Sequence, residues 1–326
     1  MHSSKRIIAA AIGISLLHCA PSLMAASYVG TAYEGFDYAT GQILSANYAN
    51  YNGGTGFTSA WGTNITGNNT YRSIEAGSLD FNLNAAPVSS GNKLLLDATV
   101  AGQSPNNATG STAIGRPIGQ TVDSGVFYFS YLTAKTLDSN RTLNLSFFGT
   151  NERFAIGQIA PGVPVSGPGG EGSGAFVASV SNTQNPVSGG GTGVNGIYTA
   201  TSPILYGLNT THLVVGRLDF NVGGGVTDTL TLYIDPANLT NEAAVSPYLQ
   251  ITSNDFGALS AFRLFAGGSS GTSPAVVYPA VAGTFDEIRL GTSYTEVTGV
   301  PEPSAATLLI GAVGLICSAR RKRRTA

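Results

Sequence analysis

Apolar and polar residues alternate along much of this chain, in stretches of the length of β-strands. Within residues 141–147 and 227–234 apolar residues alternate with polar ones, which is the pattern of a strand with one buried face. A further strand is expected at residues 126–133, and its residues 126–131 are almost all apolar or aromatic, as in a strand that is buried on both faces. Other strands are expected at residues 78–83, 93–100, 152–158, 175–180, 211–220, 260–265 and 283–290. The pattern therefore predicts an all-β protein.

Glycine, asparagine and proline separate these expected strands. No stretch of residues 27–299 shows a helical period over more than about three turns. Residues 160–196 and residues 102–119 are rich in turn-forming residues and are expected to form irregular loops. Many short strands with long connections fit a single β-sandwich of the jelly-roll type, which would span residues 27–299.

Residues 1–26 have the parts of a secretory signal peptide. Two basic residues precede an apolar stretch at residues 7–17, and Ala25 and Ala26 supply the small residues that suit cleavage. We therefore expect a signal helix that directs export and is then removed.

Residues 300–326 have the character of a membrane segment with a basic end. Residues 305–319 carry no charge and would form a helix of roughly 22 Å, somewhat shorter than the hydrocarbon core of about 30 Å. A basic cluster follows, which favours the cytoplasmic side. It consists of Arg320, Arg321, Lys322, Arg323 and Arg324. The alternative, a buried C-terminal helix, would leave these adjacent cations without partners, so we expect a single transmembrane helix at residues 305–319.

Pro301, Glu302 and Pro303 stand just before this apolar stretch. The order of tripeptide, apolar helix and basic cluster resembles the PEP-CTERM sorting signal of bacteria with two membranes. That resemblance implies passage through the general secretion machinery and later processing of the tail by an exosortase. The protein would then be membrane-anchored, at the cell surface or extracellular.

The middle of the chain resembles a group of PEP-CTERM proteins with concanavalin-like (laminin-G-like) jelly-roll domains. The resemblance lies in residues 33–38, residues 53–57 with Trp61, residues 228–236 and the closing stretch 284–292. It implies a concanavalin-like β-sandwich, with extracellular polysaccharide as a candidate partner. A structural Ca²⁺ is compatible with such a fold, although the sequence nominates no ligands for it, and no other cofactor or metal is expected.

Charge and composition disfavour several classes of function. Residues 27–299 contain nine Lys and Arg against seventeen Asp and Glu, a net charge of −8, which argues against nucleic acid as a partner. Cys19 and Cys317 lie in the terminal segments, so the middle of the chain has no disulfide and no cysteine nucleophile. His212 is its single histidine, and alternation with Val214 predicts an ordinary strand residue. Catalysis through histidine is therefore not expected.

The acidic residues do not form the spaced pair that a glycosidase requires. Asp286 and Glu287 are adjacent, so strand alternation predicts that they point to opposite faces. Glu34 and Asp37 lie three residues apart in an expected loop and are interpreted as solvated or structural. We therefore expect no catalytic residues and no enzyme.

Trp61 is a weak candidate for ligand contact, because it is the one tryptophan of the chain and lies among glycine, asparagine and threonine residues. Aromatic rings present a flat apolar face on which a sugar can stack. The other interpretation places Trp61 in the core beneath a loop, and it is the one we favour.

The leading hypothesis is an exported, non-catalytic cell-surface or extracellular-matrix protein that is sorted through its C-terminal tail. A carbohydrate-binding module that engages exopolysaccharide is the alternative. A polysaccharide-degrading enzyme of concanavalin-like fold ranks last. The targeting segments at both ends and the scarcity of catalytic residue types support this order, since fold alone does not decide function.

Overall fold

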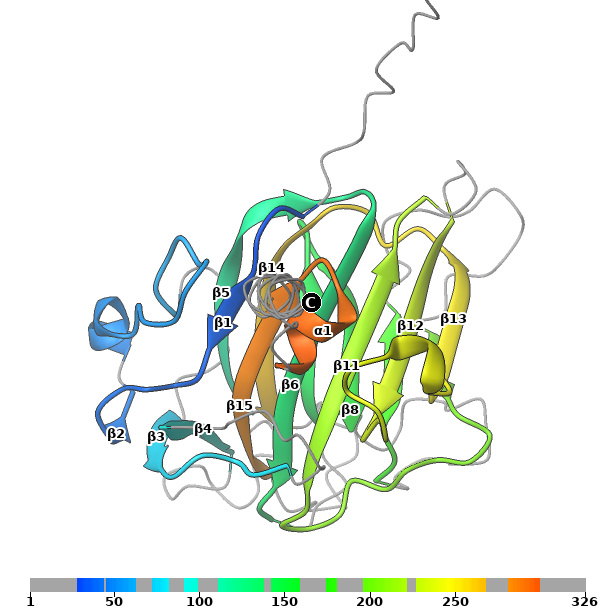
Figure 1. The fold of residues 1–326 in the computed structure, drawn as a ribbon. Coiled ribbons are helices and arrows are strands. Elements are labelled where there is room, and N and C mark those ends of the chain that lie inside the picture. The colour runs from blue at the N-terminus through cyan, green and yellow to red at the C-terminus, as the bar shows by residue number, and fades with distance from the viewer. Residues whose placement is uncertain are drawn as a thin grey trace, which may run out of the picture.

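The computed structural model describes ten stretches of the chain, which together form a β-sandwich of two antiparallel sheets (Figure 1). These stretches are residues 28–43, 45–62, 72–81, 91–98, 111–137, 142–158, 174–180, 196–221, 227–267 and 281–299. The expected signal peptide and the whole sorting segment, residues 300–326, lie outside them. Among the described residues, no helix has the length and apolar character needed to cross a membrane.

The large sheet contains nine strands and the small sheet six. The large sheet is ordered β13 (Leu249–Asn254), β12 (Asp228–Ile234), β11 (Thr211–Asp219), β6 (Val126–Lys135), β15 (Ala282–Gly291), β4 (Asn92–Asp97), β3 (Arg72–Ala76) and β2 (Gly41–Gln42), with β1 (Ala32–Glu34) beside β15. The small sheet is ordered β10 (Gly196–Thr199), β9 (Val177–Val180), β8 (Glu152–Gln158), β7 (Thr142–Phe148), β14 (Leu259–Gly267) and β5 (Ser111–Val122). The short helices are η1 (Ser45–Asn50), η3 (Glu242–Ala244) and α1 (Tyr294–Thr298).

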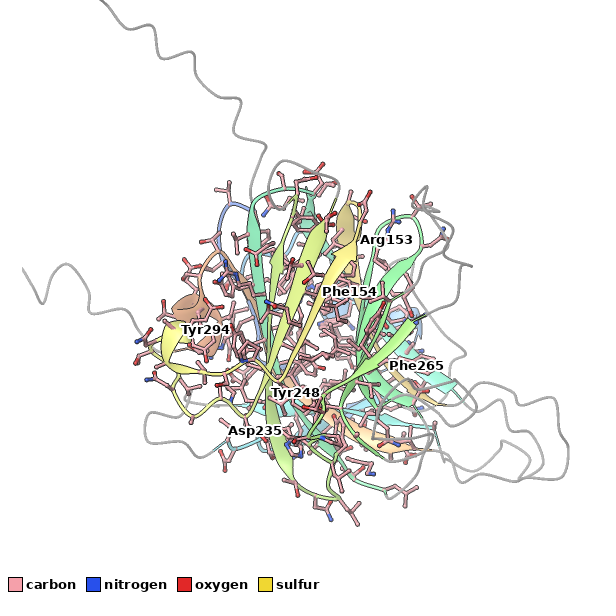
Figure 2. The ribbon with its side chains drawn as sticks, turned by 90° about the vertical axis from the view of Figure 1, so that its right-hand side faces the viewer. Arg153, Phe154, Asp235, Tyr248, Phe265 and Tyr294 are labelled. Atoms are coloured by element: carbon pink, nitrogen blue, oxygen red, sulfur yellow. The ribbon has the colours of Figure 1, made fainter. Side chains whose placement is uncertain are left out.

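Aromatic rings from both sheets fill the space between them (Figure 2). Phe127 and Phe129 of β6 project from the large sheet and meet Phe147 and Phe154 of the small sheet; all four are buried. The ring centroids of Phe129 and Phe147 lie 4.7 Å apart. Gly216 of β11 faces the Phe129 ring, and a Cβ atom there would come within 2.0 Å of it. A glycine inside this strand therefore leaves room for the core ring.

A second apolar layer covers part of the outer face of the large sheet. Leu132, Leu213 and Val215 of the sheet pack beneath Leu79 and beneath the short helix α1. The helix starts with a capping box, in which the Ser293 side chain accepts a hydrogen bond from the backbone of the third helical residue. This part of the outer face is therefore closed to solvent. Farther along the sheet, Arg217 and Asp219 of β11 are partly exposed and Gln250 and Thr252 of β13 are exposed, whereas β12 between them is buried.

An ion pair joins the two sheets at the edge where β1 and β5 lie (Figure 1). Glu34 ends β1 of the large sheet, Arg116 belongs to β5 of the small sheet, and both side chains are 1% exposed. The same carboxylate accepts hydrogen bonds from the Trp61 indole N–H at 2.9 Å, the Tyr38 hydroxyl at 2.7 Å and the Phe36 backbone N–H at 2.8 Å. Because buried charges are costly unless paired and hydrogen-bonded, this network satisfies the Glu34 carboxylate inside the fold.

The Arg116 guanidinium also has hydrogen-bond partners other than Glu34. It donates to the backbone carbonyls of Ser59 and Gly53, each at 2.8 Å, and lies 4.2 Å from the centroid of the Phe57 ring. These contacts tie the loop of residues 51–62 to β5. The buried charge pair thus links the N-terminal part of the domain to the small sheet.

The sequence-based strands agree with the structure over most of the chain, and the all-β sandwich is confirmed. The expected strands at residues 126–133, 141–147, 152–158, 175–180, 211–220, 227–234, 260–265 and 283–290 correspond to β6, β7, β8, β9, β11, β12, β14 and β15, with ends that differ by a few residues. The expected strand at residues 93–100 corresponds to β4.

Two expectations about strands were wrong. The expected strand at residues 78–83 is not a strand in its described part, because Ser78 and Leu79 hydrogen-bond to the Asp286 side chain; the strand is β3, just before it. The expected loop at residues 102–119 contains most of β5. This strand is at the edge of the small sheet, where Pro117 is tolerated because one side of the strand needs no donors.

Replacing Glu34 by glutamine tests the ion pair. We expect Glu34→Gln to lower the free energy of unfolding by about 3–5 kcal/mol, because Arg116 would remain buried without its counter-charge. Asp37→Asn is the matched control, since Asp37 lies in the same segment and is exposed, and it should change stability by less than about 0.5 kcal/mol. Urea unfolding followed by tryptophan fluorescence measures both; equal effects of the two substitutions would contradict this role.

Candidate functional site

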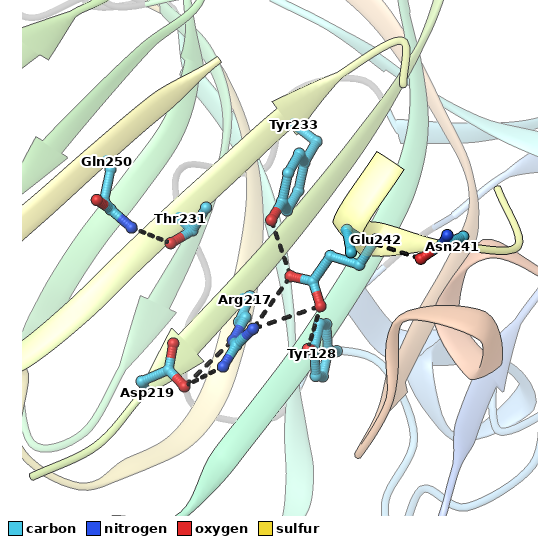
Figure 3. Close-up of polar contacts among 9 residues, drawn as sticks. Tyr128, Arg217, Asp219, Thr231, Tyr233, Asn241, Glu242 and Gln250 are labelled. Carbon is cyan, nitrogen blue, oxygen red and sulfur yellow. Dashed lines mark hydrogen bonds and ion pairs between the residues drawn. The ribbon is translucent and has the colours of Figure 1, made fainter. Parts of the chain in front are cut away.

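A row of polar side chains crosses four neighbouring strands on the outer face of the large sheet. Tyr128 on β6 stands opposite Arg217 on β11, which stands opposite Thr231 on β12, which stands opposite Gln250 on β13. Neighbouring strands lie about 4.8 Å apart, so the row is roughly 14 Å long. The Gln250 amide donates to the Thr231 hydroxyl at 3.2 Å (Figure 3). The strand register therefore gathers these four side chains into one line.

A second polar row runs beside the first. Asp219 on β11 stands opposite Thr229 on β12, and Thr229 stands opposite Thr252 on β13. Since alternate residues of a strand share a face, both rows lie on the same side of the sheet. We call the two rows together the polar face; it consists of Tyr128, Arg217, Asp219, Thr229, Thr231, Gln250 and Thr252.

Arg217 is the cation of the polar face, and two carboxylates bind it (Figure 3). Its Nε and Nη2 atoms donate to Oδ1 of Asp219 at 3.1 and 2.8 Å. Its Nη1 atom lies 3.4 Å from both carboxylate oxygens of Glu242. The hydrogen bonds to Asp219 raise the pKa of Arg217, so the guanidinium stays charged at any pH of interest.

Glu242 reaches the polar face from η3, which lies on the same side of the sheet (Figure 3). Its carboxylate accepts hydrogen bonds from the hydroxyls of Tyr128 at 2.7 Å and Tyr233 at 2.8 Å. Burial, together with the neighbouring Glu242, raises the pKa of both tyrosines. Both phenols therefore keep their protons at neutral pH and act as hydrogen-bond donors to Glu242.

Several groups of the polar face reach solvent. The side chain of Arg217 is 35% exposed and that of Asp219 is 22% exposed. Gln250 and Thr252, at the β13 end, are also exposed. Guanidinium, carboxylate, amide and hydroxyl groups thus stand side by side and offer both donors and acceptors. The arrangement suits a ligand that carries many hydroxyl groups.

No motif in the sequence marks these residues as a candidate site. Arg217 and Asp219 occupy alternate positions of an expected strand, and so do Thr229 and Thr231, so one sign of an outward polar face was present. The order of β6, β11, β12 and β13 in the sheet was the missing information, because it decides which outward residues become neighbours.

Trp61 is in the core and not on the surface. It is 1% exposed, its indole N–H donates to Glu34, and its ring stacks on Phe36 with centroids 5.3 Å apart. A ligand in solvent cannot stack on a ring that is buried in this way. The structure therefore fits the interpretation of Trp61 as a core residue. It does not fit the weaker interpretation of Trp61 as a residue that contacts a sugar.

His212 is a buried strand residue that faces inward with Val214, as the alternation predicts. Its Nδ1 atom hydrogen-bonds to Oδ2 of Asp235 at 2.7 Å, and the ring packs against Tyr206 and Phe176. The Asp235 carboxylate also accepts the backbone N–H of Leu213 at 2.9 Å, so it fixes the imidazole at the start of β11.

Asp286 and Glu287 do not point to opposite faces, which corrects the expectation from strand alternation. A β-bulge lies between Asp286 and Arg289, and Glu287 has a φ of +50°. Asp286 accepts hydrogen bonds from Ser78 and Leu79 above the outer face, while Glu287 pairs with Arg289 on the same face. The extra residue of the bulge is the reason that alternation fails here.

Burial raises the pKa of Asp286 from 3.8 to about 7. Because the folded state then holds a proton that the unfolded chain has lost, this group stabilises the fold fully below about pH 4 and loses that contribution as the pH rises through 7. The loss is of the order of 2–4 kcal/mol. Asp286→Asn stays neutral, so its stability relative to the wild type should rise between those pH values. Urea unfolding across pH measures this; a difference that does not change with pH would contradict it.

The described residues contain no group of three or more histidine, cysteine, aspartate or glutamate residues that could hold a metal ion. The sorting tripeptide Pro301, Glu302 and Pro303, and the basic cluster at residues 320–324, lie outside the described residues.

Comparisons with known proteins give distant structural similarity and no relative in sequence. No family model matches the sequence, and no curated protein matches it. One similar solved structure is an endo-β-1,4-glucuronan lyase from the fungus Trichoderma reesei, with 13% identity over 72% of this chain and 92% of the other, at a TM-score of 0.41. Another is an alginate lyase from Chlorella virus, with 9% identity, 78% and 99% coverage and a TM-score of 0.38. The globular domain of T. cruzi calreticulin, with 8% identity, covers 89% and 98% at a TM-score of 0.39.

These neighbours correct the expectation that the protein is not an enzyme. The similar structures include a glucuronan lyase and several alginate lyases, so the exclusion of enzymatic activity does not stand. At identities between 8% and 15% and TM-scores under 0.5, these similarities assign no reaction to this chain. Its function has to be argued from its own residues.

Proposed function

We propose that this protein is exported, sorted to the cell envelope through its C-terminal tail, and binds polysaccharide there through the polar face. The observation that supports binding is the row of Tyr128, Arg217, Thr231 and Gln250 across four strands. The row is roughly 14 Å long, and of its four side chains Arg217 and Gln250 reach solvent while Tyr128 and Thr231 are buried beneath them.

The chemistry of the polar face supports this ligand class. Sugar hydroxyls both donate and accept, and the face offers an amide, hydroxyls, a guanidinium and a carboxylate within two adjacent rows. The guanidinium is held in place by Asp219 and Glu242, so its orientation is fixed before a ligand arrives. A preorganised polar surface of this kind loses little entropy on binding.

The same proposal includes the type of sandwich, the two terminal helices and the place where the protein acts. The sandwich is of the concanavalin-like jelly-roll type, with an N-terminal signal helix before it and a transmembrane helix at residues 305–319 after it. The general secretion machinery exports the chain, and an exosortase processes the tail. The protein then acts at the cell surface or outside the cell, with no nucleic acid as partner.

Removing the exposed end of the polar face tests binding. We expect the double substitution Gln250→Ala and Thr252→Ala to weaken retention on insoluble polysaccharide about tenfold, because two hydrogen-bonding side chains are lost. Both residues are exposed, so folding should be preserved. Ser260→Ala with Thr210→Ala is the control, since both are exposed and lie away from the polar face. Pull-down assays against a polysaccharide panel measure retention, and the same incubations are assayed for released sugar. Equal losses in both double variants would contradict the proposal.

Changing the tripeptide tests sorting. We expect replacement of Pro301, Glu302 and Pro303 by alanine to leave the basic cluster on the chain, because the processing enzyme would lose its recognition sequence. Intact mass spectrometry of protein from the envelope and the medium distinguishes a product that ends near residue 300 from one that ends at residue 326. Val300→Ala with Ser304→Ala is the control. Normal processing of the tripeptide variant would rule out this signal.

A further inference from the structure

We infer that the ligand of the polar face is a neutral, hydroxyl-rich polysaccharide and not a polyuronate. This inference rests on the proposed function, because it names the ligand class of the same site. It concerns the charge of the face and the number of cationic donors that remain available to a ligand.

The donors of Arg217 are already engaged by acidic groups. Nε and Nη2 bind one oxygen of Asp219, and Nη1 lies between the two oxygens of Glu242. A uronate carboxylate recognised by arginine takes two parallel N–H groups of the guanidinium fork. Asp219 occupies the fork formed by Nε and Nη2, and Glu242 lies at Nη1 of the end-on fork, so a uronate bound through two N–H groups would have to displace one of these carboxylates.

The charge of the site also opposes an anionic ligand. One guanidinium stands against the carboxylates of Asp219 and Glu242, which leaves a net charge of −1 at the polar face. Residues 27–299 as a whole have a net charge of −8. A polyuronate carries one negative charge per sugar, so both the local and the overall field repel it.

Other described cations on the outer face of the large sheet do not change this balance. Lys93 on β4 donates to the backbone carbonyls of Ala76 and Gly77 at 3.1 and 2.8 Å. Arg289 on β15 pairs with Glu287 at 2.5 Å and stacks over a tyrosine ring. In the order of the large sheet, β6 separates β15 and β4 from β11, and helix α1 packs on β15, β6 and β11. Neither cation is placed to bind a ligand on β11, β12 and β13.

The same groups suit neutral sugars. Arg217 uses only Oδ1 of Asp219, which leaves Oδ2 to accept a hydroxyl proton. The Gln250 carbonyl accepts, and the Thr252 hydroxyl both donates and accepts. These contacts involve no net ion pairing, so binding should depend little on salt.

Affinity electrophoresis of the purified full-length protein tests the inference. The probes are a neutral β-glucan, a neutral galactomannan and alginate, each cast in the gel at several concentrations and at low and high salt. We expect at least one neutral polysaccharide to retard the protein, with less than about a twofold change in Kd across salt. Alginate should give no retardation.

Two substitutions at Asp219 sharpen the test, because they change the charge of the polar face while leaving Glu242 in place. Asp219→Asn keeps the size and an acceptor oxygen but frees part of the guanidinium, so alginate binding should appear and should strengthen by about three- to tenfold from high to low salt. Asp219→Glu keeps the charge and is the matched control, which should remain without alginate binding.

The outcomes separate this inference from the proposed function. Retardation of the wild type by alginate, lost at high salt and lost in the Gln250→Ala, Thr252→Ala variant, would overturn the neutral ligand while polysaccharide binding at the polar face would stand. No retardation by any probe, or retardation that this variant does not affect, would overturn the proposed function and the inference with it. Retardation by a neutral probe alone, reduced in this variant, supports both.

Discussion

The buried pair of Glu34 and Arg116 is the constraint on which the arrangement of this sandwich most depends. It joins a strand of the large sheet to the edge strand of the small one, and both charges are removed from water. Such a pair is stable only when every remaining donor and acceptor is satisfied. Here the backbone of residues 36, 53 and 59 and the side chains of Tyr38 and Trp61 satisfy them. The path of the N-terminal segment is therefore specified by polar contacts in the interior as well as by burial of apolar area.

The polar face has a different physical origin. Its residues are far apart in sequence, and strand register alone aligns them. The short helices η3 and α1 cover neighbouring parts of the same outer face. A ligand can therefore reach only the part of the sheet that these helices leave uncovered. Glu242 both anchors η3 to the sheet and neutralises part of Arg217. One carboxylate thus links the packing of a loop to the charge that a ligand would meet.

Much of the fold could be predicted from the sequence, because β7 and β12 alternate and β6 is apolar on both faces. Strand β5 could not be predicted, because Pro117 is typical of a loop. Proline is compatible with a strand at the edge of a sheet, and the sequence does not show that β5 is an edge strand. The bulge at Glu287 could not be predicted either, because one inserted residue does not change the alternation of apolar and polar residues in a recognisable way. Trp61 was open to two interpretations, and its buried partner Glu34 decides between them. The sequence shows outward polar positions on single strands, but the candidate site itself could not be predicted, because it depends on which strands become neighbours.

Hydrogen–deuterium exchange of the full-length protein, with and without a neutral polysaccharide, tests the central claim most directly. The account predicts slower exchange in β11, β12 and β13 and in the η3 segment, with the small sheet unchanged. Slower exchange confined to the small sheet, or to the loops near Trp61, would contradict it, and the polar face would then have no place in ligand binding.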